Sequence, residues 1–147
     1  MAITHVSVTE ARARHDAGAV IVDVRSTREY AAGHPAGSLN VPLLEHDEDT
    51  DQLVANPDFV RVIQALFTPE TPLMISCQSG VRSVRASLML ETFGFQDVTN
   101  VLGGFGGSKN RVAGQPFDAG WQESGLPVET ATPGAAYRDL LAKVDEL

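Results

Sequence analysis

The chain has 147 residues, a length that suits one domain with a full hydrophobic core, and its apolar fraction of 43% is ordinary for a globular protein. The formal net charge of −8 argues against nucleic acid or an anionic membrane surface as a bulk partner. A single cysteine excludes an internal disulfide framework and a cysteine-rich metal site.

The first residues carry neither the basic region nor the long apolar core of a signal peptide. No apolar run approaches the length that crosses a bilayer. We therefore expect a cytoplasmic protein, in a reducing compartment that suits a working thiol.

Two capping boxes mark helix starts in the first part of the chain. Ser7 is followed three residues later by Glu10, and Ser26 is followed in the same way by Glu29. The apolar run between them is typical of a core strand in a parallel sheet. The pattern predicts a helix over about 7–17, a strand at 19–24, a short helix over 26–33 and a short strand at 38–41.

The stretch 45–51 is acidic and invites comparison with a calcium loop. Asp47, Asp49 and Asp51 alternate as the ligands of such a loop do, but Gln52 stands where that loop needs glycine. We therefore reject a calcium site and predict a solvated loop.

Helical and strand patterns alternate through the rest of the chain, which is typical of parallel crossover connections. Asn56 and the proline after it favour a helix start, and Gly94 is a suitable helix end. The pattern predicts a helix over about 57–67, a strand at 72–76, a helix over 84–93, a strand at 97–102 and a C-terminal helix over 135–147.

The only cysteine, Cys77, follows the strand at 72–76 and precedes a helix. A loop in this position lies at the carboxyl edge of an open α/β sheet, where ligands bind. Loop N–H groups, the helix dipole and the charge of Arg82 would favour a thiolate there, and Gly80 would permit the turn. The sequence therefore predicts a nucleophilic cysteine in an anion-binding cradle rather than a structural cysteine.

The segment 77–83 has the pattern Cys-x-x-Gly-x-Arg-Ser, which resembles the active-site loop of the rhodanese (sulfurtransferase) superfamily, single-domain type. The stretches 20–42 and 100–128 are similar to the first and last signatures of that family. The resemblance covers about 5–129. It implies an α/β fold with a mostly parallel sheet of about five strands and helices on both faces.

The resemblance also implies a sulfurtransferase that works by double displacement and needs no metal or organic cofactor. Cys77 would take sulfane sulfur from thiosulfate, a persulfide or a polysulfide as a persulfide of its own, and pass it to a thiol, cyanide or a partner protein. Ser83 would also cap the helix, and Arg82 would stabilise charge or bridge an acid beneath the loop. The expected persulfide-binding residues are Gln78, Ser79, Gly80, Val81, Arg82 and Ser83.

Arg25 follows the first core strand and is a candidate for the pocket rim, although pairing with Asp23 or Glu29 is the alternative. His34 is expected to satisfy carbonyls in a turn. Trp121 is expected to anchor the core.

The residues 105–120 form an insertion relative to the family pattern, either a lid that carries Lys109 and Arg111 or a surface loop. We expect one domain over 1–147, whose C-terminal helix docks on the domain or on a second copy.

Three other functions stay open. A binding or regulatory module could keep the fold and the cysteine without the chemistry. A Cys-dependent phosphatase would use a similar cradle, but only four residues separate Cys77 from Arg82, one fewer than in its Cys-x5-Arg motif. A redox sensor with an exposed thiol ranks lower, because no second cysteine could resolve a sulfenic acid.

Overall fold

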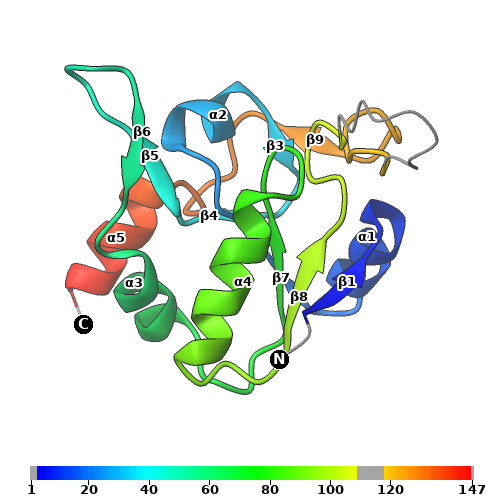
Figure 1. Ribbon diagram of the computed structural model, residues 1–147, viewed down its shortest axis with the longest axis horizontal. Helices are drawn as coiled ribbons and strands as arrows, with labels where there is room; N and C mark the ends of the chain where they lie inside the picture. The colour runs from blue at the N-terminus through cyan, green and yellow to red at the C-terminus, as the bar shows by residue number, and fades with distance from the viewer. Residues whose placement is uncertain (1–2, 109–117, 147) are drawn as a thin grey trace.

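A central sheet of five parallel strands organises the chain, in the order β1-β8-β7-β2-β4 (Figure 1). The computed structural model describes residues 3–108 and 118–146. The α/β class and the five-stranded parallel sheet expected from the sequence are confirmed. The strands are β1 (Thr4–Val6), β2 (Val20–Asp23), β4 (Leu39–Asn40), β7 (Leu73–Ser76) and β8 (Val98–Val101).

Helices cover both faces of this sheet, as Figure 1 shows. One face packs against α3, α4 and α5, and the other against α1. The short α2 lies at the carboxyl ends of the strands (Figure 1). The helices are α1 (Val8–Asp16), α2 (Thr27–Ala32), α3 (Phe59–Leu66), α4 (Arg82–Thr92) and α5 (Tyr137–Asp145).

The core strands are buried on both faces because each face has helical cover. Val22 and Ile75 point into the larger core beneath α3, α4 and α5, whereas Ile21 and Met74 point into the smaller core beneath α1. Trp121 is 1% exposed in the smaller core, and its Nε1 donates to the carbonyl of Pro127 at 2.7 Å. The expected core role of Trp121 is confirmed.

Local sequence explains several of the helix ends. The serines of the two expected capping boxes do cap their helices: Ser7 accepts from the N–H of Glu10, and Ser26 and Glu29 form a complete capping box. Gly94, which follows α4, has a φ of +97°, a left-handed conformation that glycine adopts without steric cost.

The acidic stretch differs from the predicted loop, because it contains part of an antiparallel hairpin. Strand β5 (Leu44–His46) pairs with β6 (Leu53–Ala55), and only the residues between them form a turn. Leu53 and Val54 are 41% and 46% exposed, so β6 has no buried face to give an alternating signal. Leu44 of β5 packs at the edge of the larger core.

Helix α5 docks on the domain itself, one of the two alternatives expected. Leu140 and Val144 are buried in the larger core, and Arg61 of α3 pairs with Asp145 at 3.4 Å. A short ladder between β3 (His34–Pro35) and β9 (Val128–Glu129) leads the chain toward this helix. Lys109 and Arg111 lie outside the described residues. Among the described residues, no helix is long and apolar enough to cross a membrane.

Candidate active site

Cys77 lies directly after β7, at the carboxyl edge of the sheet, where the sequence placed it. Strand β7 is flanked by β2 and β8, so the cysteine sits at the centre of the edge and not at its rim. The residue is only 1% exposed, whereas the redox-sensor alternative expected an exposed thiol.

Two backbone N–H groups converge on the sulfur. The N–H of Gly80 donates to Cys77 Sγ at 3.1 Å, and the N–H of Ser83 donates at 3.3 Å. The hydroxyl oxygen of Ser83 lies 3.2 Å from the same sulfur. Gly80 has a φ of +100°, which turns its N–H inward and which a side chain would resist. Two N–H donors that point at one sulfur can stabilise a sulfur anion.

Ser83 does not cap α4, which corrects the expected role. The N-cap position is Val81, whose side chain makes no capping bond. Ser83 is the second residue of the helix, and its N–H donates to the cysteine sulfur. The sulfur therefore takes the place of the capping oxygen, at the positive end of an eleven-residue helix.

Arg82 bridges an acid beneath the loop. Its two terminal nitrogens donate to Glu29 Oε1 and Oε2 at 2.7 and 2.8 Å. Burial alone would raise the pKa of Glu29, but the hydrogen bonds and charge of Arg82, with bonds from Ser26, lower it from 4.5 to about 2. The hydrogen bonds and charge of Glu29 outweigh burial and raise the pKa of Arg82. Both side chains are therefore charged at neutral pH, and their ion pair holds the start of α4 against α2.

Arg25 is 2% exposed and lies behind the loop. It pairs with Asp23 at 2.8 Å rather than with Glu29, and its Nη1 donates to Gln78 Oε1 at 3.2 Å. Its guanidinium also donates to the carbonyl of Gly33 at 2.7 Å and lies 4.4 Å from the ring centre of Phe105. The buried guanidinium thus connects the end of β2 with the side chain of Gln78, the residue after the cysteine.

The turn 103–107 supports the loop from behind, a role that the sequence analysis missed. The N–H of Phe105 donates to the carbonyl of Cys77, and that of Gly106 to the carbonyl of Gln78, both at 2.8 Å. A Cβ on Gly104 would collide with the carbonyl of Cys77. The glycines of this turn could have indicated this role, because a close approach between two backbone segments requires residues without a side chain.

Of the predicted site residues, Gly80 and Ser83 contact the cysteine sulfur, and the others lie around the same loop. Ser79 is partly buried, whereas Val81 is 68% exposed on the outer side of the loop. His34 is buried and bonded at both ring nitrogens, to Tyr30 O and Thr132 Oγ1. Within the described part of the chain, no three His, Cys, Asp or Glu side chains gather as a metal site. The engagement of Arg82 by Glu29 leaves a phosphatase without its phosphate-binding arginine.

Comparison with known proteins gives a consistent result. A family profile described as a rhodanese-like domain matches residues 7–110. The senescence-associated protein DIN1 of Raphanus sativus is 36% identical over 126 residues, covering 86% of this chain and 61% of the relative. Thiosulfate sulfurtransferase 16, chloroplastic, of Arabidopsis thaliana is 32% identical, covering 84% and 91%. The chain thus spans about three fifths of the length of the first curated relatives it matches and most of others.

Solved structures agree on the fold. A rhodanese-like domain from an Anabaena protein superposes with a TM-score of 0.65 at 19% identity, covering 90% of this chain and 86% of that one. The human single-domain sulfurtransferase superposes with a TM-score of 0.56 at 26% identity, covering 71% and 93%.

Proposed function

This chain belongs to the rhodanese-like family, and from that premise we propose that it is a sulfurtransferase that carries sulfane sulfur on Cys77. The observation that carries the proposal is the convergence of the Gly80 and Ser83 N–H groups on the cysteine sulfur. Relatives named thiosulfate sulfurtransferase support the reaction class.

In the first step, the Cys77 thiolate attacks the outer sulfur of a donor such as thiosulfate. A new S–S bond forms, the bond between that sulfur and the sulfite group breaks, and sulfite leaves with the electron pair. The negative charge then rests on the outer sulfur of the persulfide. Donors in the segment 78–83 stabilise the anion, namely the two N–H groups and the Ser83 hydroxyl, which turns to donate.

In the second step, an acceptor nucleophile attacks the outer sulfur. With cyanide, a C–S bond forms, the S–S bond breaks, and thiocyanate leaves while Cys77 regains its thiolate. A thiol or the cysteine of a partner protein would accept sulfur in the same way. Because the enzyme holds the sulfur between two half-reactions, ping-pong kinetics are expected.

The roles of the remaining site residues follow from their contacts. Gly80 provides the backbone conformation, and Arg82 fixes the loop through its pair with Glu29. Gln78 is held by Arg25 on one side and through its carbonyl by Gly106 on the other. Ser79 and Val81 form the outer part of the loop, where a donor would enter.

Intact-mass measurement tests the proposal directly. The chain is incubated briefly with thiosulfate or polysulfide and then with cyanide, alongside Cys77→Ala. We expect a gain of one sulfur atom, its removal by cyanide, and no gain in the variant. Ser87→Ala, which changes a buried serine that does not touch the sulfur, should load as the wild type does.

The absence of loading by either donor, with a folded chain and an alkylatable Cys77, would contradict the proposal. The alternative of a binding or regulatory module would then hold. Loading that persists in Cys77→Ala would also contradict it, because sulfur would reside elsewhere on the chain.

A further inference from the structure

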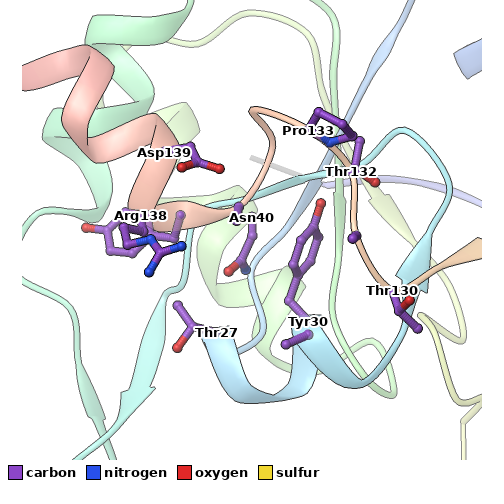
Figure 2. Close-up of a pocket in the computed structure, with 12 residues that line it drawn as sticks. Thr27, Tyr30, Asn40, Thr130, Thr132, Pro133, Arg138 and Asp139 are labelled. Atoms are coloured by element: carbon purple, nitrogen blue, oxygen red, sulfur yellow. The ribbon is translucent and has the colours of Figure 1, made fainter.

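A cavity lies apart from Cys77, beneath the segment 130–133 and between α2 and the start of α5 (Figure 2). Its volume of about 590 Å³ falls within the range of small-molecule sites. No residue of the segment 77–83 lines it. The proposed sulfur transfer therefore does not account for this cavity.

Asn40, at the end of β4, points a buried oxygen into the cavity. The residue is 1% exposed, and its Nδ2 donates to the carbonyls of Asp23 and Arg25, both at 3.0 Å. Because a carbonyl can only accept, these two bonds fix which end of the amide faces them. The other end, Oδ1, has no hydrogen-bond partner among the described residues. Figure 2 shows this oxygen directed toward the space between Tyr30 and Arg138.

The neighbouring polar group at the cavity floor is also an acceptor. The Tyr30 hydroxyl donates its proton to the carbonyl of Ser38 at 2.5 Å, so its oxygen can offer only lone pairs to a ligand. Burial raises the pKa of Tyr30 to about 12, although its hydrogen bonds with Ser38 and Thr132 lower the pKa, so the hydroxyl stays neutral. A ligand that fits this floor must therefore bring a hydrogen-bond donor.

The cavity walls favour a ligand that is uncharged and mostly apolar. Arg138 and Asp139 bring one positive and one negative charge from the start of α5, so the mouth favours neither sign. The acids nearest the floor are already engaged, because Asp23 pairs with Arg25 and Glu129 accepts from Gly37 and Thr132. An ammonium group there would lie beside neutral oxygens without a free carboxylate, which is costly. Flat and small apolar groups form most of the remaining surface: Tyr30, Ala31, Ala131, Pro133, Ala136 and Tyr137.

We propose that this cavity binds a neutral aromatic molecule of one or two rings, whose N–H group donates to Asn40 Oδ1. Indole is the simplest molecule of this class. Its N–H would satisfy the unpaired oxygen, and its rings would contact the apolar walls. The site would work independently of Cys77.

A titration of the full chain followed by two-dimensional amide NMR tests the proposal. The probes are indole and 1-methylindole, which differ in the N–H group. We expect saturable shifts at the amides of Asn40, Ala131 and Ala136 with indole. The affinity for 1-methylindole should be about tenfold lower, because it leaves Oδ1 unpaired.

Substitutions at the wall supply the controls, since removing Asn40 would also release two backbone carbonyls. Ala131→Trp and Ala31→Trp fill the cavity from opposite exposed walls, and either folded variant should lose the shifts. Cys77→Ala should bind indole as the wild type does. The proposal is overturned by shifts that do not saturate or that map elsewhere. Equal affinity for the two probes, or unchanged binding in a folded tryptophan variant, would also overturn it.

Discussion

The Glu29 carboxylate stabilises two helix starts, those of α2 and α4. Its Oε1 accepts from the N–H of Ser26 at 3.2 Å to complete the α2 cap, while both oxygens hold Arg82 at the start of α4. The cysteine sulfur accepts from the N–H of the very next residue, Ser83. A single acid on α2 thus fixes the helix end that faces the sulfur.

The Glu29→Gln variant keeps a side chain that can cap α2 but removes the charge. At pH 7 we expect its unfolding free energy to fall by about 1–2 kcal/mol, after allowance for solvent screening of this partly exposed pair. Because the folded pKa of Glu29 is depressed to about 2, its contribution is complete above the ordinary value of 4.5 and is lost as the pH falls toward 2. Urea denaturation from pH 7 to pH 2 should show the two proteins converging. A difference that stays constant over this range would contradict the role of the ion pair.

The Ser83→Ala variant separates the contribution of the Ser83 hydroxyl from that of the Ser83 N–H. This change removes the oxygen 3.2 Å from the sulfur and leaves the backbone donor. We expect persulfide formation to slow by about ten- to hundredfold, since one donor to the developing anion is lost. The rate of sulfite release after rapid mixing measures this step.

The matched control is Ser87→Ala, one turn further along α4. Ser87 is equally buried, but its hydroxyl donates to the carbonyl of Ser83 and does not contact the sulfur. Equal slowing in both variants would assign the effect of Ser83 to packing of the helix.

At the scale of elements, the turn 103–107 determines where the cysteine loop can lie. Gly104 has a φ of +56°, and any Cβ there would meet the carbonyl of Cys77. We expect Gly104→Ala to lower the unfolding free energy by about 2–4 kcal/mol, from backbone strain plus overpacking. Sulfur loading should fall with it, because the loop must shift.

Gly125→Ala separates strain from collision. Gly125 has a similar φ of +73°, but nothing lies within 4 Å of a Cβ built on it. This variant should lose only about 1–2 kcal/mol in urea denaturation and should keep its loading rate. Similar losses of loading in the two variants would show that the close approach to Cys77 does not matter.

The elements were predictable from sequence to different degrees. The strand before Cys77 has four buried residues in a row, and the capping boxes are local patterns, so each was evident. The partner of Arg25 was left open between Asp23 and Glu29. Arg82, which lies 53 residues beyond Glu29, forms the ion pair with Glu29. Arg25 is therefore left to pair with Asp23. Contacts of this kind depend on the fold and leave no local signal. The exposed β5–β6 hairpin was missed for the same reason.

At the scale of the whole molecule, we propose that the chain is one domain that unfolds as a unit. Helix α5 supports this proposal, since Leu140 and Val144 join the same core as strands β2 and β7. Fluorescence of Trp121 reports on the smaller core, and far-ultraviolet circular dichroism reports on the helices. The two signals should give one coincident urea transition.

Leu140→Ala tests this coupling. The side chain is 5% exposed, and its loss should lower the unfolding free energy by about 2–5 kcal/mol, with both signals shifted equally. Leu88→Ala, at a site 45% exposed on α4, should change it by about 0.5 kcal/mol or less. A circular dichroism change that precedes the Trp121 signal in Leu140→Ala would mean that α5 unfolds separately.

The position of β1 in the sheet has a consequence for synthesis of the chain. Thr4 pairs with Thr99, so the first strand of the sheet in chain order waits for the last one to be synthesised. Until then, β1 has no strand to pair with, and Val6 cannot join the smaller core. Such long-range closure slows folding, because the ordering entropy precedes the contacts that offset it. A nascent chain of this protein that stalls before β8 would therefore be a substrate for chaperones, even though β1 pairs along its whole length with β8 in the finished sheet.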